Sequence, residues 1–534
     1  MVDLHLLEDQ IAARMAAGRV PGLALAALKN GEVVYARGFG LASVETSLPV
    51  TPDTLFRIGS ITKPLTATAV MRLVEAGKLD LDRPVTEYVP WLTFSDPGAA
   101  ERITLRLLLS HSAGLPTDHR PFGRRDPGGL AAYVREEIAG YPFIAPPGKL
   151  YSYSNPGPRL AGYVAEVVGG QPYTELMQEL VFDPLEMKRT TFDPTVAMTY
   201  PLAQSHDLAD DGTLRVQHRF ADDTGGYPSG FAISTVLDLL NFALMQMNGG
   251  RSPKDRRKIL SPQSVVEMQA VQANCYTATN GGYGLGLAID TYKGLRRVSH
   301  DGSISTFGSC LAMIPSAGVA VAIMLNRGPG FWDQMAKIVD DLLDQLLGLP
   351  AGPAPDPRTV KPDRSAWPRY IGTYLGRSTG LASIRAEHDR LILDWNETTI
   401  PLSAYRDNVY FGRKPGEEES ISVGFVPEDT GSVRYLMLDG SPSERFELDR
   451  SFQPDPAAWA AYVGRYVGAE KIAVRLEGDR LWVYSEDAGA EMPCVALSNA
   501  RFACDEGVLE FQVPAGGGAP QLKFEGVFTL TRAT

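Results

Sequence analysis

The sequence predicts an α+β domain, an antiparallel sheet flanked by helices, followed by two small all-β antiparallel barrels. Three observations predict this order. Hairpin, helix and strand patterns succeed one another over the first 348 residues, a proline-rich stretch then interrupts them, and the tail contains an internal repeat. Elements in this order favour an antiparallel sheet with helices packed on it, and a separate β region after it.

The first unit opens with a predicted hairpin and closes with a predicted helix. Two apolar runs flank Asn30-Gly31 within residues 21–40, and Asn-Gly is the strongest short hairpin signal. Apolar spacing of three and four residues predicts helices over residues 62–77, 238–247 and 332–347. Alternating patterns predict strands over residues 285–291 and 311–326.

The tail begins after a linker and then repeats itself. Residues 349–364 are too rich in proline to propagate a helix or a central strand, so we predict an extended linker. Beyond it, WPRYIGTY at 367–374 returns 92 residues later as WAAYVGRY at 459–466. The repeat predicts two copies of one unit, and short alternating strands suit a small closed barrel; one larger β-domain is the alternative. We therefore expect a catalytic domain at 1–348 and barrels at 365–452 and 453–534.

Composition excludes several classes of partner. A net charge of -12 argues against nucleic acid, and the chain has neither a basic amphipathic stretch nor an apolar run long enough to span a membrane. The N-terminus lacks the features of a secretory signal, although a mature form without its leader would look the same. The four cysteines are scattered and the histidines lack metal-ligand spacing. We expect a cytoplasmic protein without metal or other cofactor.

Ser60 and Lys63 are the candidate nucleophile and its base. They form the single Ser-x-x-Lys of the chain, at the point where an apolar helix begins. Residues three apart share a helix face, so the Lys63 amine can reach the Ser60 hydroxyl and take its proton, provided burial depresses the pKa of the amine. The helix N-terminus would also direct N–H groups toward a carbonyl oxygen. An N-capping serine with a solvated lysine is the alternative.

Two further segments supply candidate partners. Tyr153 and Asn155 form a Tyr-x-Asn on a loop bounded by Gly and Pro; the phenol can pass a proton to a leaving amine, and the carboxamide can bind a substrate amide. A buried tyrosine beside an Asx-turn is the structural alternative. His300, Gly302 and Ser303 precede a predicted strand, where the glycine would let substrate approach and the Ser303 N–H could face an oxyanion. His300 alone would more often be structural.

Together these motifs resemble those of the class C β-lactamase and DD-peptidase superfamily. The hairpin at 21–40, the phrase ITLRLLLSHSAGLP at 103–116 and residues 229–235 support the resemblance, which covers about residues 5–347. It implies a β-lactamase/transpeptidase-like fold, acylation of Ser60, proton relay by Lys63 and Tyr153, and substrate positioning by Asn155. It also implies an oxyanion hole formed by the backbone amides of Ser60 and Ser303.

One departure from the β-lactamase pattern changes the expected substrate. Those enzymes usually carry lysine where this chain has His300, and a histidine is mostly neutral at pH 7. D-aminopeptidases of the superfamily have histidine there and two small β-barrels after the catalytic domain. The chain resembles them most in plan, with lipocalin-like barrels, so a short peptide or amide is the expected substrate. In that family a loop of the last barrel reaches the site, and residues 485–492, with Glu486, Asp487 or Glu491, are the equivalent candidate.

Other functions remain open from the sequence. An esterase or a β-lactamase-related hydrolase could use the same scaffold, and a non-catalytic binding protein could use the barrels alone. The barrels could also drive homo-oligomerisation. Ser112, within a Ser-x-Ser-x-Gly, resembles a nucleophile elbow that lacks its first glycine, so it is a weaker candidate nucleophile.

Overall fold

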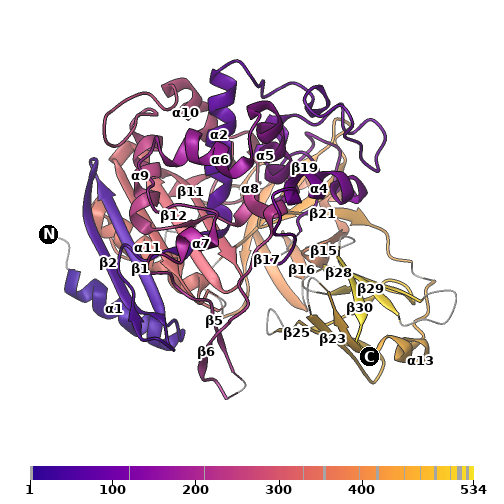
Figure 1. Ribbon diagram of the computed structural model, residues 1–534. Coiled ribbons are helices and arrows are strands. Elements are labelled where there is room, and N and C mark those ends of the chain that lie inside the picture. Colours follow the sequence, from indigo (N-terminus) through magenta and orange to yellow (C-terminus); the bar gives the residue numbers. More distant parts are fainter. Residues whose placement is uncertain are drawn as a thin grey trace.

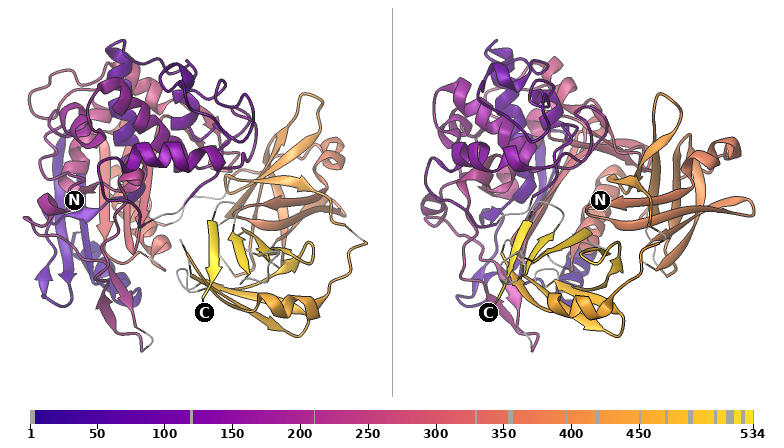
Figure 2. Two further views of the ribbon diagram at one scale, coloured as in Figure 1. Left: turned by 45° about the vertical axis from the view of Figure 1, so that its right-hand side comes forward. Right: turned by 90° about the vertical axis from the view of Figure 1, so that its right-hand side faces the viewer.

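The computed structural model describes residues 4–533 apart from short gaps, which are 119–120, 210, 329, 353–356, 396, 417–419, 450, 469–470, 486–489, 505–506, 514–519 and 525–527. A sheet with helices on both faces forms the first unit, and two β units follow it (Figure 1). Figure 2 shows the first barrel, in orange, beside the catalytic unit, and the last strands, in yellow, adjoining that barrel. The α+β fold with two barrels is therefore confirmed.

A nine-stranded antiparallel sheet organises the first unit, in the order β3-β2-β1-β13-β12-β11-β10-β9-β8. Strands from the two ends of the domain meet at its centre, because β1 (Gly22–Lys29) pairs with β13 (Val319–Leu325). The other strands are β2 (Glu32–Ser43), β3 (Leu48–Pro49), β8 (Ala273–Asn274), β9 (Gly282–Tyr283), β10 (Ala288–Tyr292), β11 (Leu295–Ile304) and β12 (Phe307–Ile314).

The predicted hairpin is present. Strands β1 and β2 are joined at Asn30 and Gly31, whose φ angles of 53° and 87° are those of a type I′ turn. The strand predicted over 311–326 is instead two strands, because Pro315 to Ala317 form a 3₁₀ turn and Gly318 has a φ of 60°. A proline and a left-handed glycine end β12 and allow the chain to reverse into β13.

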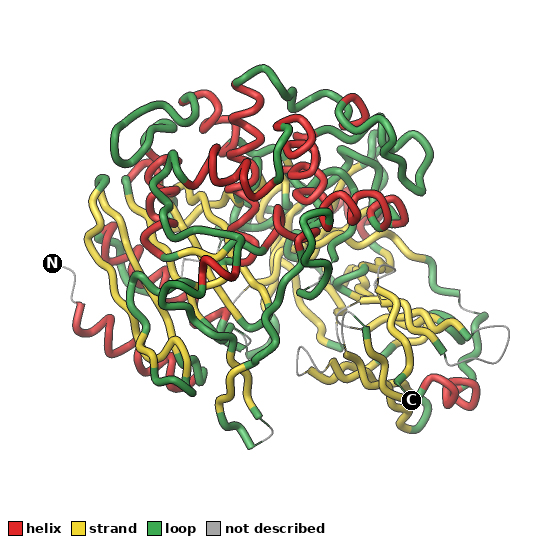
Figure 3. The backbone as a smooth tube through the Cα atoms, viewed as in Figure 1, coloured by secondary structure: helices red, strands yellow, loops and turns green. Residues whose placement is uncertain are grey.

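Helices cover both faces of the sheet. On one face α1 (Leu4–Ala17) and α11 (Trp332–Leu347) pack against Leu23, Leu25 and Ala27 of β1. On the other face the alternate residues Ala24 and Ala26 face a larger core. Its main helices are α2 (Thr62–Glu75), α5 (Pro156–Gly169) and α9 (Val236–Met247). The three predicted helices correspond to α2, α9 and α11, and Figure 3 shows how the helices gather in this unit.

The tail forms two related β units. Strands β14 to β21 close into a barrel, whereas β22 to β30 form a nine-stranded sheet whose β25 and β26 are its edges. The first barrel has β14 (Gly372–Gly376), β15 (Gly380–Glu387), β16 (Arg390–Trp395), β17 (Thr398–Arg406), β18 (Val409–Arg413), β19 (Ser420–Pro427), β20 (Val433–Leu438) and β21 (Ser441–Phe446). The second has β22 (Gly464–Val467), β23 (Lys471–Glu477), β24 (Arg480–Ser485), β25 (Ala490–Pro493), β26 (Val495–Ala496), β27 (Arg501–Cys504), β28 (Gly507–Gln512), β29 (Gln521–Phe524) and β30 (Phe528–Arg532).

The sequence repeat reflects one packing motif used twice. In the first barrel the Tyr374 hydroxyl donates to the Tyr370 carbonyl at 2.7 Å; in the second, Tyr466 donates to Tyr462 at 2.9 Å. Tyr370 and Tyr462 each stack on a phenylalanine of their own barrel. The repeated letters are therefore buried aromatic anchors that close the start of each barrel.

The first barrel is seated directly on the catalytic unit. An apolar cluster joins Leu150 and Tyr151 of the catalytic unit to Val426 and Met437 of β19 and β20. Lys149 also pairs with Glu428 at 2.8 Å. Because Tyr151 lies two residues before Tyr153, this seat supports the loop that carries a candidate catalytic residue. Among the described residues no helix combines the length and apolar character needed to cross a membrane.

Candidate active site

Ser60 lies in a tight turn between the sheet and helix α2. Strand β4 (Phe56–Arg57) leads into the 3₁₀ turn η1 (Gly59–Ile61), and α2 follows at Thr62. Gly59 has a φ of 48°, and a Cβ there would lie 2.5 Å from the backbone nitrogen of Ser303. Only glycine fits this position, which holds the nucleophile turn against β11. The partly exposed Ser60 is therefore held beside the Ser303 N–H, as an oxyanion hole would require.

Lys63 is fully buried and surrounded by neutral partners. Its amine lies 2.9 Å from Ser60 Oγ, 2.7 Å from Asn155 Oδ1 and 2.7 Å from the Ser229 carbonyl. A neutral amine matches this set, since its two N–H groups can donate to the two carbonyl oxygens while its lone pair accepts from the Ser60 hydroxyl. Burial, with the charge of Arg159, holds the pKa of Lys63 well below its ordinary value. The amine can therefore act as a base.

Asn155 orients the lysine through both ends of its carboxamide. It ends the loop before α5, and while Oδ1 accepts from Lys63, Nδ2 donates to the backbone carbonyl of Asp118. The second bond fixes which end of the carboxamide faces the amine. A substrate amide bound by Asn155 would use the second N–H or the second lone pair.

Tyr153 lies at the nucleophile on a loop packed with aromatic rings. It shares a hydrogen bond with Ser60, and its ring lies 4.8 Å from the Lys63 amine and 4.4 Å from the His111 ring. Burial raises the pKa of Tyr153, an effect that the Ser60 hydrogen bond only partly offsets. Tyr153 therefore stays a phenol at neutral pH, which suits it to donate a proton rather than to abstract one.

His300 is held neutral in a single tautomer. Its Nδ1 lies 2.6 Å from the backbone carbonyl of Asp301, which can only accept, so Nδ1 carries the hydrogen. Nε2 therefore accepts from the Tyr283 hydroxyl, 2.7 Å away. Burial and the nearby Lys63 lower the pKa of His300 to about 3. Both ring nitrogens have protein partners, so His300 orients Tyr283, a residue that the sequence analysis did not identify.

Gly302 has a packing role that the sequence analysis did not anticipate. We expected the missing side chain to leave room for substrate. The space beside Gly302 is filled by the protein, because a Cβ there would lie 2.0 Å from the Ile58 carbonyl and 2.4 Å from Ser309 Oγ. Gly302 thus lets β11 approach the segment before Ser60. The exposed Ser303 lies one residue further along β11.

His111 was also missed, although it lies within the segment LLLSHSAGLP. It is buried against Tyr153 and Tyr283, its Nδ1 accepts from the Ser154 N–H at 3.1 Å, and its Nε2 is buried without a hydrogen-bond partner. Burial holds the pKa of His111 well below its ordinary value. Two neutral histidines therefore flank the tyrosines of the site.

These two histidines predict acid sensitivity of the fold. A histidine that is neutral when folded takes up a proton on unfolding below pH 6.5, so stability falls as pH decreases, by up to about 1.4 kcal/mol per pH unit for each histidine. We expect His300→Gln, which keeps an acceptor-capable side chain, to make the loss of stability between pH 6.5 and 4.5 less steep. Urea unfolding at several pH values measures this; parallel curves for the variant and the wild type would contradict it.

A cavity of about 240 Å³ opens beside Tyr153, between the catalytic unit and the first barrel. Pro116, Thr117, Ile144 and Ser152 line one side with Tyr153. The other side comes from two turns of the barrel, Arg377 and Ser378 after β14, and Ser441 and Pro442 at the start of β21. The candidate site is therefore enclosed by two units, and its one charged lining side chain is cationic.

The first barrel, not the second, supplies this wall within the described part of the chain. The loop predicted to reach the site, residues 485–492, contains Glu486 and Asp487, which lie outside the described residues. Glu491 pairs with Arg475 at 2.5 Å on a neighbouring strand of its own barrel. The described end of that loop is thus engaged within the second barrel.

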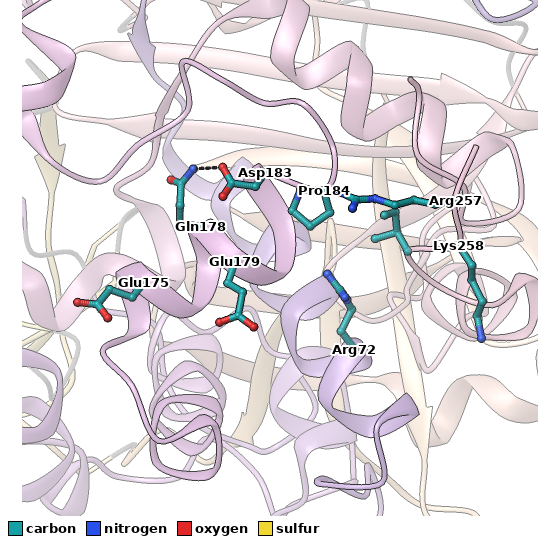
Figure 4. A pocket seen from close by; sticks show the side chains of 9 residues that line it. Arg72, Glu175, Gln178, Glu179, Asp183, Pro184, Arg257 and Lys258 are labelled. Carbon is teal, nitrogen blue, oxygen red and sulfur yellow. Dashed lines mark hydrogen bonds between the residues drawn. The ribbon is translucent and has the colours of Figure 1, made fainter. Parts of the chain in front are cut away.

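A larger cavity of about 480 Å³ lies elsewhere on the catalytic unit (Figure 4). Its lining includes Arg72, Glu179 and Asp183, and none of the candidate catalytic residues. Its charged groups already have protein partners: Arg72 donates to the Leu180 carbonyl, and the Asp183 carboxylate accepts from Gln178, as the dashed line in Figure 4 shows. The chemistry is located at the smaller cavity.

Comparisons with known proteins agree with this geometry. The β-lactamase family model matches residues 7–345. Penicillin-binding protein 4 of Amycolatopsis lactamdurans is 31% identical over 340 residues, which is 62% of this chain and 86% of that protein. The octameric penicillin-binding protein homologue from Pyrococcus abyssi is 27% identical, with a TM-score of 0.59, over 83% of this chain and 99% of that one. A structure of SurE with D-Leu is 25% identical with a TM-score of 0.62, at the same coverage.

The last two likenesses cover more of the chain than the catalytic unit alone. A fold of this kind, a buried lysine in contact with a serine at a helix start, and a family match over more than half of the sequence all agree. The chain belongs to the β-lactamase family of serine hydrolases, which includes the penicillin-binding proteins.

Proposed function

We propose that this protein is an acyl-enzyme hydrolase of short peptides or amides, resembling a D-aminopeptidase. The observation that carries the proposal is the Lys63 amine, fully buried, in contact with Ser60 Oγ and otherwise bonded only to neutral oxygens. Such an amine can take a proton from a serine at neutral pH, which a solvated lysine cannot.

The reaction uses each group at a stated atom. Ser60 Oγ attacks the substrate carbonyl carbon while its proton moves to Lys63 Nζ, and the backbone amides of Ser60 and Ser303 stabilise the oxyanion. The carbon–nitrogen bond then breaks as the Tyr153 phenol gives its proton to the leaving amine and recovers one from Lys63. Water hydrolyses the ester by the reverse proton path. Because the phenol stays protonated at neutral pH, the site is suited to amides, whose leaving groups need a proton.

The cavity supports small substrates. At about 240 Å³ it accommodates only a few residues beside Tyr153, and Arg377 gives its barrel wall a positive charge. With His300 neutral, Arg377 is the side chain of this lining that can meet a substrate carboxylate. The SurE structure of similar fold contains D-Leu, which supports a preference for D-residues here.

Acyl-adduct detection across a substrate library tests the proposal. Purified protein is mixed with D- and L-dipeptides, their C-terminal amides and matched nitrophenyl esters, and the intact mass is followed over time. We expect an adduct on Ser60 with D-peptides and amides, more with a free carboxylate than with a capped one, and none in Ser60→Ala. Turnover of esters alone would support an esterase instead. No adduct with any compound would contradict catalysis and support a binding protein.

Two broader predictions accompany this function. The Pyrococcus abyssi relative is octameric, and we propose that this chain also forms a homo-oligomer, which sedimentation velocity would test. A cytoplasmic location stays a prediction from the sequence, testable by fractionation of cells that produce the protein.

A further inference from the structure

A buried ion pair lies directly behind Lys63, and the reaction described above does not use it. Arg159 on α5 contacts Asp118 at 3.0 Å, and the two side chains are 2% and 0% exposed. The hydroxyls of Tyr133 and Tyr141 also donate to the same carboxylate oxygen, at 3.0 Å and 2.9 Å. Burying two charges costs more free energy than their attraction returns unless the geometry is very good, so such a pair is weak evidence for stability.

Each member of the pair holds one of the two oxygens that bind the lysine amine. Arg159 Nε donates to Ser229 Oγ at 3.0 Å, and the carbonyl of the same serine accepts from Lys63. The backbone carbonyl of Asp118 accepts from Asn155 Nδ2, and the same carboxamide accepts from Lys63 through Oδ1. The ion pair therefore forms the support of Ser229 and Asn155, the two non-reacting partners of the amine.

The pair also provides the full charges nearest to the amine. The charge of Arg159 lowers the pKa of Lys63, and that of Asp118 raises it. The other titratable groups facing the amine, Tyr153, His111 and His300, are neutral at pH 7 because burial raises the pKa of the tyrosine and lowers those of the histidines. The balance of charge at Lys63 thus depends on Arg159 and Asp118.

We propose that Arg159 and Asp118 are positioning residues for Lys63, which hold its two acceptor oxygens and set the balance of charge that keeps the amine ready to accept the Ser60 proton. Neither residue contacts the reacting atoms. The inference rests on the proposed function, because it assigns to the pair the control of a base that must act on Ser60.

Opposite shifts of the pH profile distinguish this role from a purely structural one. The rate constant kcat/KM for hydrolysis of p-nitrophenyl acetate is measured from pH 5 to 10 for each variant. Arg159→Met removes the cation and exposes Lys63 to an unpaired carboxylate, so we expect the acid limb to move up by at least one pH unit, with about a tenfold loss at pH 7 that is regained by pH 9. Asp118→Asn should move the limb down.

Three further variants complete the test. Arg159→Lys keeps the charge and should leave the limb within about half a unit of wild type, with a lower kcat because the bond to Ser229 is lost. The double variant Arg159→Met with Asp118→Asn removes both charges and keeps the limb near wild type if the single variant does not fold. An acid limb unmoved in Asp118→Asn, or moved upward, would overturn the inference. If Lys63→Met hydrolysed the ester as wild type does, the proposed function itself would fail.

Discussion

Substitution of Lys63 with methionine is expected to lower kcat/KM by about 10³- to 10⁴-fold, which is the range measured when the base that activates a nucleophile is removed. Methionine fills a similar volume without an amine, so Ser60 stays in place with no group to take its proton. Stopped-flow measurement of the first turnover separates the effect on acylation from effects on later steps. Thr62→Ser, a neighbour on the same helix, is the control.

The same substitution should stabilise the fold, which makes the prediction specific. In the unfolded chain Lys63 is protonated below about pH 10, whereas burial favours its neutral form in the folded protein. The unfolded state therefore binds more protons, and stability of the wild type rises with pH between 7 and 9. Lys63→Met removes this dependence, so its advantage is largest at pH 7 and shrinks toward pH 9. A variant that lost both activity and stability would indicate that the amine is structural.

The parts of the fold that the sequence predicted well have local causes. Asn30-Gly31 forms the hairpin because both residues tolerate a positive φ, and the helix at 332–347 follows from one apolar stripe that ends at Gly348. The repeated aromatic letters of the tail correspond to equivalent buried contacts in both barrels. Ser60 and Lys63 are adjacent on the 3₁₀ turn and the first turn of α2, so their contact too is local.

The parts that sequence reasoning missed depend on long-range packing. Asp118, Arg159 and Tyr283 come from a loop, a helix and a short strand, and nothing in their local patterns indicates that they meet around Lys63 and His300. Tyr283 follows a Gly-Gly pair that the sequence suggests is a turn. The barrel that faces the site was also misassigned by analogy, because the seating of one domain on another depends on surface shapes that leave no periodic signal.

Gly424→Ala is expected to unseat the first barrel and so to damage the site from outside it. Gly424 on β19 packs against the catalytic unit, and a Cβ there would lie 2.2 Å from the Cβ of Tyr276 and 2.9 Å from its carbonyl. Neither atom is at the end of a flexible side chain, so the barrel must move. The Ala278 N–H, which donates to Ser422 Oγ across the same seat at 3.0 Å, would lose its partner.

The damage should reach Tyr153 through the residues between them. Gly440 of the barrel lies against Tyr151 and Cys275, and the Tyr151 ring lies 5.7 Å from that of Tyr283, which donates to His300. Displacement of the barrel would also remove Arg377 from the cavity wall. We expect kcat/KM for a short peptide to fall about 10- to 100-fold, since errors of about 1 Å in placement cost this much. Hydrolysis of p-nitrophenyl acetate, too small to need the barrel wall, should fall less.

A matched glycine separates this effect from the general effect of a Gly→Ala substitution. Gly140 has no heavy atom within 4 Å of its Cβ position, so Gly140→Ala should leave both substrates and the unfolding temperature close to wild type. Calorimetry of Gly424→Ala should show two transitions where the wild type shows the barrel and the catalytic unit melting together. A single transition with unchanged peptide turnover would mean that the barrel is not needed to hold the cavity. A loss equal for peptide and ester would instead locate the whole defect at Tyr153, because only the peptide extends to the barrel wall.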